Sequence, residues 1–528
     1  MKTAADSRAF LLALLAACGA RLAPAATPEP ATSRIASLTP AEAARLAAEF
    51  PGVDVPINVP GFGSFVARRA LSLNGLETLD AETAGALAAY EKGLILLDGL
   101  TTLDADTAAA VARFKVDVLM LGGVKTLSAD AARVLAGFGG GSLCLGGLTN
   151  LSAETAAAVA GFRGKNLCLG GLTTLSAAAA RGLAGFAGAK LSLDGFADLS
   201  PEAAAALAES RAHMLRLDGL AALSLDAARN LARFRGQALY LGGLTALEDE
   251  AAGALATFAG PHMYFTSLIP RIGGDVPLTP NMARLLLRCT GGMSLRLEGL
   301  ESLDGPAAVE AAGILATARQ PVSFPKLARM TPAVAAQLAQ ARWQTLQFDG
   351  LGALTPEVAR VLAAFRGGEL RLDGLTGLST DAARSLADFQ GMWLQLNGLK
   401  GLPVDTAEVL AAARVGRFSL EGLEALEPAA AAALAGSRAW DGRLPGVTGF
   451  ETVDSVAVAR ALAGRQHRLA LPNLARISPR TFLALVEKED VEIPSLDALR
   501  FIPEPDGSPT DDFVMPEHFL RRQRLRGR

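Results

Sequence analysis

Hydrophobic and polar residues alternate in short runs along most of this chain. In the run LSLNGL at residues 71–76 the alternation is that of a short strand with one buried face. Asn-Gly, Asp-Gly, Glu-Gly or Gly-Gly follows the strand in most such runs, which predicts a turn whose glycine adopts a positive φ. Apolar residues then recur at Ala84, Leu87 and Ala88 with helical spacing, so the run predicts a strand, a turn and an amphipathic helix.

This pattern repeats every 24 residues, and the glycine of an LxLxGLxxL motif marks each repeat. In the first half the marker lies at Gly75, Gly99, Gly123, Gly147, Gly171, Gly195, Gly219 and Gly243, with Ser267 next. A longer, irregular repeat leads from Ser267 to Gly299, and Lys326 follows. The regular series resumes at Gly350, Gly374, Gly398, Gly422 and Gly446, and it closes with Asn473 and Ser495. Independent domains would not keep such a period.

Each repeat also has the sequence signals of a helix start and a helix end. Ser200-Pro201-Glu202 offers an N-cap, a proline at the first helical position and a carboxylate near the positive end of the helix. Glycines such as Gly93 then end the helix before the next strand. A unit of this size cannot bury its own apolar side, so neighbouring units must stack.

The stacked pattern resembles the leucine-rich-repeat proteins over about residues 35–500. The resemblance implies an α/β solenoid with a parallel sheet on its concave side and short helices on its convex side. The chain departs from the common pattern because Leu76 and its equivalents replace the buried Asn of the turn. We therefore expect the turn to satisfy its backbone groups in another way.

The first residues have the pattern of an export signal. Lys2 and Arg8 precede the apolar residues 9–17, a run too short for a membrane-spanning helix. The segment at residues 15–19 resembles a bacterial lipobox, which implies lipidation of Cys18 and a membrane-anchored protein of the cell envelope. Cleavage further on, with a periplasmic or secreted product, and a retained segment are the alternatives.

These patterns divide the chain into five segments. We expect a signal peptide with lipobox at 1–18, a flexible linker at 19–33, an irregular N-terminal cap at 34–70, the solenoid at 71–503 with an irregular unit at about 260–295, and a C-terminal tail at 504–528.

Composition excludes several classes of protein. The chain has 528 residues with 50% hydrophobic and 20% charged residues, so it is not a disordered protein. Its net charge of −3 gives no broad basic footprint, so we expect no nucleic-acid partner. No later segment is apolar for long enough to span a membrane, so we expect membrane contact through the lipid alone. The mean hydropathy of +0.30 is instead that of a repeated core.

The strand residues three positions before the marker are expected to be exposed on the concave face. In the first half they are Ser72, Leu96, Met120, Cys144, Cys168, Ser192, Arg216, Tyr240 and Tyr264. Two of the three tyrosines, Tyr240 and Tyr264, lie on adjacent repeats beside Arg216 and His262, just before the irregular unit. Aromatic residues beside arginine are frequent anchors of recognition surfaces, so these four residues are our candidate ligand-binding site. The alternative is a tyrosine ladder without a ligand.

Other residue groups permit more than one interpretation. Cys144 and Cys168, with Met120 beside them, could form a disulfide, hold a soft metal or fill apolar space, and we favour apolar filling. Acids before the marker, such as Asp373 beside Arg371, are interpreted as turn residues rather than a Ca²⁺ site. The three tryptophans, Trp343, Trp393 and Trp440, are expected to plug the loops between helix and strand.

No catalytic motif is present in the sequence, since it has four histidines without metal-site spacing, no GxSxG and no GxxxxGK[ST]. We therefore expect no enzyme, no cofactor and no metal. The sequence favours an exported, lipid-anchored repeat scaffold that binds a protein or a glycan on its concave face. A structural spacer protein of the bacterial envelope without a specific ligand is the alternative.

Overall fold

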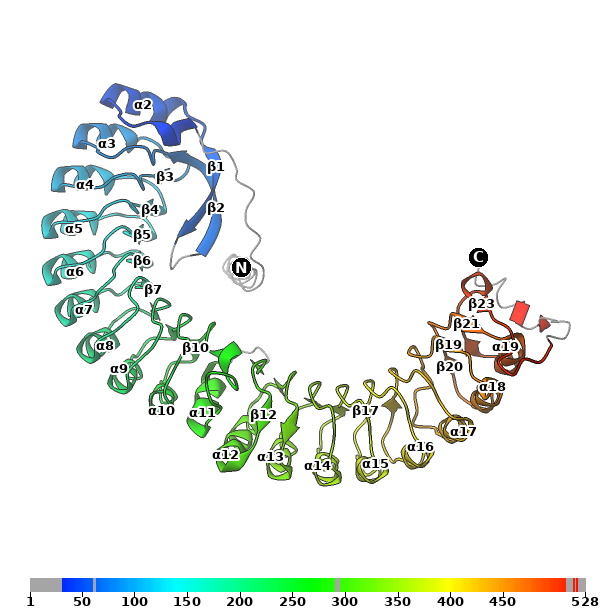
Figure 1. Cartoon of the computed structure of the whole chain (residues 1–528). Helices are drawn as coiled ribbons and strands as arrows, with labels where there is room; N and C mark the ends of the chain where they lie inside the picture. Colours follow the sequence, from blue (N-terminus) through cyan, green and yellow to red (C-terminus); the bar gives the residue numbers. More distant parts are fainter. Residues whose placement is uncertain (1–30, 60–62, 290–294, 510–515, 518, 521–528) are drawn as a thin grey trace, which may run out of the picture. The chain divides into compact units, whose positions relative to one another are not determined.

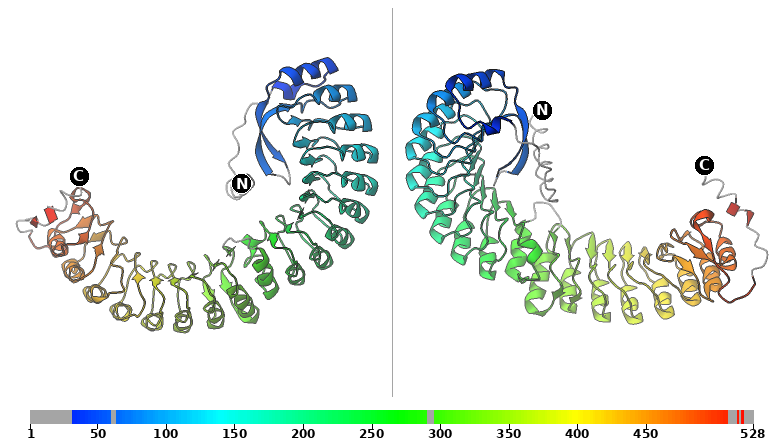
Figure 2. Two further views of the ribbon diagram at one scale, coloured as in Figure 1. Left: turned by 180° about the vertical axis from the view of Figure 1, so that it is seen from behind. Right: turned by 45° about the horizontal axis from the view of Figure 1, so that its top comes forward.

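We describe the fold from a computed structural model of the chain. It describes residues 31–59, 63–289, 295–509, 516–517 and 519–520. The chain forms two compact units, Met1–Leu268 (unit 1) and Ile269–Arg528 (unit 2). Within each one the strands line the inner side of the stack and the helices form its outer side (Figures 1 and 2).

Unit 1 alternates short helices with short strands. Its elements are η2 (Ala31–Arg34), α2 (Pro40–Glu49), β1 (Val53–Val59), β2 (Gly63–Ser72), α3 (Ala81–Leu87), β3 (Ile95–Leu96), α4 (Ala105–Val111), β4 (Val118–Met120), α5 (Ala129–Leu135), β5 (Ser142–Cys144), α6 (Ala153–Val159), β6 (Asn166–Cys168), α7 (Ala177–Leu183), β7 (Lys190–Ser192), α8 (Pro201–Ala208), β8 (Met214–Arg216), α9 (Leu225–Leu231), β9 (Ala238–Tyr240), α10 (Asp249–Leu255) and β10 (His262–Tyr264).

Unit 2 has the same alternation with shorter strands. Its elements are η3 (Ile269–Arg271), α11 (Pro280–Cys289), β11 (Leu295–Arg296), β12 (Ser302–Leu303), α12 (Gly305–Ala316), β13 (Val322–Ser323), β14 (Arg329–Met330), α13 (Pro332–Leu338), β15 (Thr345–Gln347), α14 (Pro356–Leu362), β16 (Glu369–Arg371), α15 (Thr380–Leu386), β17 (Trp393–Gln395), α16 (Val404–Ala411), β18 (Phe418–Ser419), α17 (Pro428–Gly436), β19 (Gly449–Phe450), α18 (Ser455–Ala463), β20 (Leu469–Ala470), β21 (Arg476–Ile477), α19 (Pro479–Val486), β22 (Val491–Glu492), η4 (Leu496–Ala498) and β23 (Arg500–Phe501).

The sheets confirm the expected parallel stacking. In unit 1, β2 to β10 pair in chain order, and successive strands are parallel, with residues 24 positions apart as partners. Unit 2 contains a four-stranded parallel sheet (β15 to β18), a three-stranded parallel sheet (β19, β21 and β23) and three parallel strand pairs among the described residues. The fold is therefore a leucine-rich-repeat-like α/β solenoid. One strand departs from the pattern, because β1 is antiparallel to β2 and forms a hairpin with it.

The residues expected to form an irregular cap contain this hairpin and α2. Thr39 caps α2, and Glu42 hydrogen-bonds back to the Thr39 backbone N–H at 2.9 Å, which completes a capping box. The hairpin extends along the inner side of the strands that follow it (Figures 1 and 2). The sequence did not predict this hairpin, because β1 and residues 63–70 of β2 lie outside the repeat motif.

The expected N-caps are present, whereas the expected glycine C-cap was wrong. Helix α3 ends at Leu87 with Ala88 as its C-cap, and Ala88 keeps a right-handed backbone (φ −62°), so no glycine is needed there. The Ser200 side chain accepts a hydrogen bond from the Ala203 N–H at 3.2 Å, and Pro201 is the first residue of α8. Asp80 caps α3 in the same way, with 2.8 Å between its Oδ1 and the Thr83 nitrogen. The interior is filled by leucines of strand, turn and helix, and by phenylalanines that stack from coil to coil. The rings of Phe138 and Phe162 lie 6.2 Å apart.

The marker glycine is needed for space rather than for a positive φ. Among the described glycines, positive φ values occur at Gly52, Gly273, Gly305, Gly442 and Gly507, and not at the markers. A Cβ on Gly171 would instead overlap the carbonyl oxygen of Gly146 in the preceding coil. The expectation of a left-handed turn glycine was therefore wrong. Close approach of one coil to the next requires this residue.

The residue before the marker replaces the missing turn Asn of the common repeat. In most coils where it is Asp or Asn, its side chain accepts a hydrogen bond from the next coil, whereas Asp349 Oδ1 is buried without a hydrogen-bond partner among the described residues. Asp98 Oδ1 accepts from the Gly122 N–H at 2.7 Å, and Asn397 Oδ1 accepts from the Glu421 N–H at 3.0 Å. Burial raises the pKa of Asp98. Arg371 lies 3.6 Å from Asp373, so the interpretation of these acids as turn residues is confirmed.

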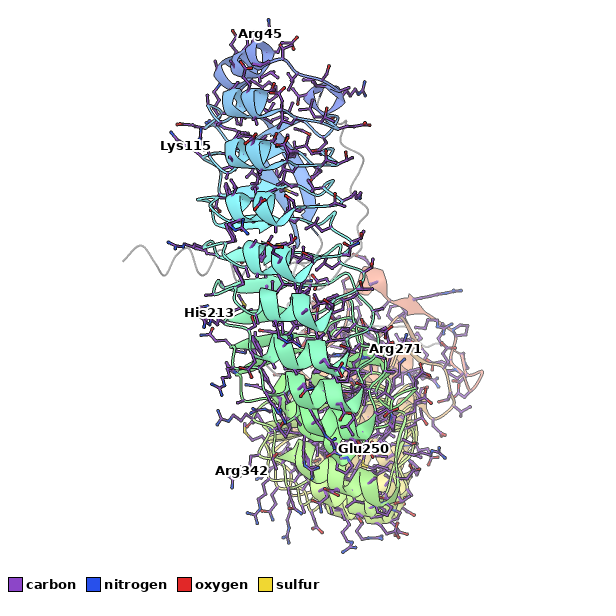
Figure 3. All side chains as sticks on the ribbon, turned by 90° about the vertical axis from the view of Figure 1, so that its left-hand side faces the viewer. Arg45, Lys115, His213, Glu250, Arg271 and Arg342 are labelled. Atoms are coloured by element: carbon purple, nitrogen blue, oxygen red, sulfur yellow. The ribbon has the colours of Figure 1, made fainter. Side chains whose placement is uncertain are left out.

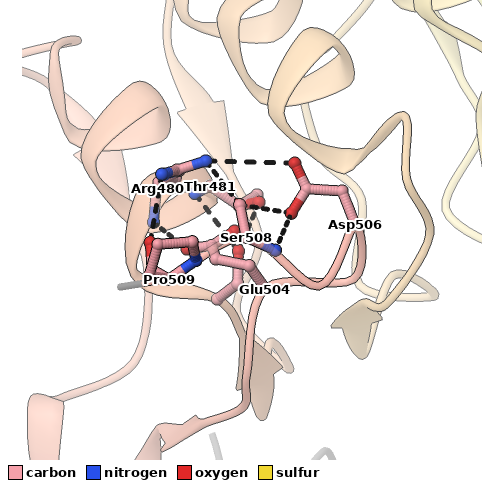
Figure 4. A network of polar contacts seen from close by, with 7 residues as sticks. Arg480, Thr481, Glu504, Asp506, Ser508 and Pro509 are labelled. Carbon is pink, nitrogen blue, oxygen red and sulfur yellow. Dashed lines mark hydrogen bonds and ion pairs between the residues drawn. The ribbon is translucent and has the colours of Figure 1, made fainter. Parts of the chain in front are cut away.

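The irregular unit and the C-terminal end close with local contacts. After β10, η3 is followed by a narrow loop in which the Gly273 N–H donates to the Val276 carbonyl at 2.7 Å. At the other end, Arg480 of α19 binds the segment 504–509: its N–H donates to Glu504 Oε1 at 2.8 Å and its guanidinium to the Ser508 hydroxyl at 2.6 Å (Figure 4).

In the part of the chain that is described, no helix has the length and apolarity needed to cross a bilayer.

We predict that removing one of the side chains that accept a hydrogen bond from the next coil destabilises unit 2. Asn397→Ala leaves the Glu421 N–H without its acceptor, and such a loss costs about 1 kcal/mol of unfolding free energy. Asn397→Asp keeps an oxygen acceptor and should cost less. Denaturant unfolding followed by circular dichroism measures both. An Asn397→Ala protein with the midpoint of the unsubstituted chain would contradict this role.

Candidate binding surface

The parallel register brings three candidate residues together on the inner face of unit 1. Arg216 of β8 pairs with Tyr240 of β9, and Tyr240 pairs with Tyr264 of β10. The Tyr240 and Tyr264 rings are stacked, with centroids 4.4 Å apart and planes 15° apart. His262, the fourth candidate, lies at the start of β10 with its ring centroid 6.2 Å from that of Tyr264. The sequence therefore grouped these four residues correctly, and whether they bind a ligand stays a prediction.

Burial changes along this column of the inner face. The residues from Ser72 to Ser192 were expected to be exposed, and the structure contradicts this: Leu96, Met120, Cys144 and Cys168 are all buried. They form one apolar cluster with Ala70 of β2, against which Val55 of β1 packs. The hairpin is the physical reason, since it extends along the inner side of these strands. At Arg216, Tyr240 and Tyr264 the column is partly exposed.

Arg216 is held by two carboxylates. Its Nε lies 2.5 Å from Asp218 Oδ2 and 3.5 Å from Asp194 Oδ2. Asp218 is fixed in turn, because its Oδ1 accepts a hydrogen bond from the Gly242 N–H at 2.6 Å. Burial raises the pKa of Asp194, and Arg216 opposes this shift. The guanidinium is thus oriented and largely neutralised beside the tyrosine pair.

The hydroxyl of Tyr240 has a raised pKa. Burial, followed by the neighbouring Tyr264, raises the pKa of Tyr240 to about 12. Its hydroxyl lies 4.0 Å from the sulfur of Met214. The phenol therefore stays protonated at any physiological pH and can donate a hydrogen bond to a ligand.

The sulfur-containing residues support the interpretation as apolar filling. Cys144 and Cys168 are in register on β5 and β6, are buried and are not bridged by a disulfide. The neighbouring Cys168 thiol and burial raise the pKa of Cys144. Among the described residues, no group of three or more His, Cys, Asp and Glu is placed to hold a metal ion. Cys18, the predicted lipidation site, lies outside the described residues.

One exposed aromatic residue of unit 2 was missed by the sequence analysis. Trp343 and Trp440 are buried, as predicted. Trp393 is instead on β17, its residue is 37% exposed, and the Arg417 guanidinium lies 5.4 Å from its ring centroid. Its place in the repeat was the available signal: Trp393 lies five residues before its marker glycine, on the strand, whereas Trp343 lies seven before its marker and in a loop.

Comparisons with solved structures find repeat proteins of the same general kind. An internalin (inlF) from Listeria monocytogenes is 14% identical, with 70% of this chain and 85% of that chain covered and a TM-score of 0.23. The TLR13–ssRNA13 complex gives 16% identity, 71% and 61% coverage and a TM-score of 0.27. The mouse RP105/MD-1 complex is 14% identical, with 79% of this chain and 77% of that chain covered and a TM-score of 0.29.

No protein-family model matches the chain, and no curated protein matches its sequence. Because the structural likenesses have TM-scores below 0.5, the assignment of the fold stands on this chain's own strand pairing and helix order. The chain is a leucine-rich-repeat-like solenoid by that architecture.

We predict a pH effect from Tyr240. An unfolded tyrosine ionises near pH 10, whereas folded Tyr240 keeps its proton up to about pH 12. Between these values the unfolded chain binds fewer protons than the folded chain, so the free energy of unfolding falls as pH rises. Tyr240→Phe should remove this part of the fall, measured by denaturant unfolding across that range. An unchanged slope in Tyr240→Phe would contradict the perturbed hydroxyl.

Proposed function

We propose that this chain is a recognition scaffold that binds a protein partner on the inner face of β8 to β10. The observation that carries the proposal is the change of burial along one column of residues. The column is buried from Ser72 to Ser192, with an apolar stretch from Leu96 to Cys168, and it opens at Arg216, Tyr240 and Tyr264. A partner that reaches the inner face of unit 1 would meet these side chains and His262 first.

The chemistry of the patch favours a protein over a glycan. Sugars stack on the open faces of aromatic rings, and in the stacked pair one face of each tyrosine ring is covered by the other. The ring edges and hydroxyls remain for contact, and tyrosine in this form is a frequent anchor of protein interfaces. The salt bridges to Asp194 and Asp218 neutralise Arg216. We therefore propose a partner with apolar and hydrogen-bonding side chains rather than an acidic one.

The scaffold also lowers the cost of binding. The tyrosines project from paired strands and already contact each other, so little side-chain entropy remains to be lost when a partner binds. Catalysis has no part in this proposal.

The test is a binding measurement with matched variants. A partner captured by crosslinking in intact envelopes is purified, and its affinity for the full chain is measured. We expect Tyr240→Ala with Tyr264→Ala to weaken binding on the order of 30-fold or more, as for central aromatic anchors. Tyr240→Phe with Tyr264→Phe keeps the rings and should retain most of the affinity. Equal affinity in the alanine variant, selective binding of glycans, or no partner at all would overturn the proposal, and the last outcome would favour a spacer.

We also propose that the protein is exported and anchored through lipid on Cys18, from the pattern of charge, apolar run and lipobox at its start. The expected result is a mature N-terminus at Cys18 that carries acyl chains in the mass spectrum. Cys18→Ala should abolish the lipid and release the protein from the membrane fraction. An unlipidated N-terminus further along the chain would reject the anchor while leaving export intact.

A further inference from the structure

Seven exposed positive charges of unit 1 lie on one edge of the stack. They lie in the loops that follow α4, α6, α8 and α9 and lead to the next strand. We call these residues the basic edge: Arg113, Lys115, Arg163, Lys165, Arg211, Arg233 and Arg235. All of them are exposed. Asp117 and Glu209 are the acidic residues of the same loops, and the loops after α5, α7 and α10 contain no charged residue.

The opposite edge of unit 1 is acidic. N-caps and first helical turns contribute Asp80, Glu82, Asp104, Asp106, Asp130, Glu202, Asp226, Glu248, Asp249 and Glu250. Lys115 and His213 project from one side of the stack in Figure 3, whereas Glu250, at the start of α10, lies on the other side. Unit 1 therefore has two separate edges of opposite charge.

Stabilisation of the helix ends does not account for Arg163 and Arg235. Favourable charges at a helix C-terminus act within the last turn, and Arg163 lies three residues beyond the C-cap Ala160. Arg235 lies three residues beyond the C-cap Ala232 in the same way. Lys115 pairs with Glu91 at 2.6 Å. Within the residues that the structure describes, the arginines of the basic edge and Lys165 form no ion pair, so their charge is available to a ligand.

We propose that the basic edge of unit 1 lies against an anionic phospholipid surface. Guanidinium groups bind phosphate through paired hydrogen bonds, and five of the seven cations are arginines. They are spread over loops on one side of the stack, which suits contact with a flat surface better than with a single pocket-sized anion. This contact uses an edge of the coils, so it leaves the inner face of β8 to β10 open and is independent of the proposed protein site.

The test uses the full chain with Cys18→Ser, so that no lipid anchor contributes. The protein is sedimented with vesicles of phosphatidylglycerol and phosphatidylcholine in equal parts, and with phosphatidylcholine alone. We expect binding to the anionic vesicles only, falling steeply with added salt. Replacing Arg163, Arg211 and Arg235 with Gln should weaken it on the order of 100-fold, since each basic residue near an anionic surface contributes about fivefold.

A matched control removes the same charge from another face. Arg133, Arg181 and Arg229 lie on the helices of the outer side and are exposed, and their replacement with Gln should leave vesicle binding unchanged. Soluble glycerol phosphate at millimolar concentration should not compete, which separates a surface from a free phosphate. The proposal is overturned by equal loss in both triple variants, by competition from glycerol phosphate, or by binding of double-stranded DNA without binding of vesicles.

Discussion

In-register stacking of coils that cannot bury their own apolar side is the constraint on which this structure depends. From β2 to β10, each strand of unit 1 pairs with the residues 24 positions away, so the strand side chains lie beside their equivalents in the next coil. A position that is wrong for stacking would be wrong in every coil. The marker glycine illustrates this constraint. A Cβ on Gly171 would overlap Gly146 of the coil before it, so this position requires glycine although its φ is ordinary.

The same register turns local chemistry into continuous columns. The carboxylate or amide before the glycine binds the backbone of the next coil, so Asp98 and Asn397 perform the task that a buried turn Asn has in the common repeat. Phenylalanines stack along the interior in the same way. Because successive coils repeat, their helices all point in one direction. Residues that suit helix N-termini therefore accumulate on one edge, and loop residues beyond the C-termini accumulate on the other.

The sequence predicted the elements that recur in the 24-residue repeat, and it did not predict the elements outside the repeat. Strand, turn, helix, capping residues and the parallel sheet all follow from local patterns such as LSLNGL at residues 71–76, and the structure has them. The grouping of Arg216, Tyr240, His262 and Tyr264 followed from counting along the repeat, since parallel register sets which residues are neighbours. The β1–β2 hairpin carries no repeat signal, and its packing against Leu96 and Met120 joins residues far apart in sequence. Exposure of the inner face could not be predicted without it.

That long-range contact decides where unit 1 can recognise a partner. A regular solenoid offers the same inner face at every coil, so nothing in the period alone selects one strip over another. Val55 packs against the apolar cluster around Met120, Cys144 and Cys168, so the inner face of the first coils is not exposed to a partner. The column opens where its residues change from apolar to Arg216 and the tyrosine pair, and the carboxylates of Asp194 and Asp218 hold the arginine in place there. Selectivity in this fold therefore arises from an irregular element acting on a regular one. The hairpin limits the usable surface, and the repeat supplies rigid side chains at its border.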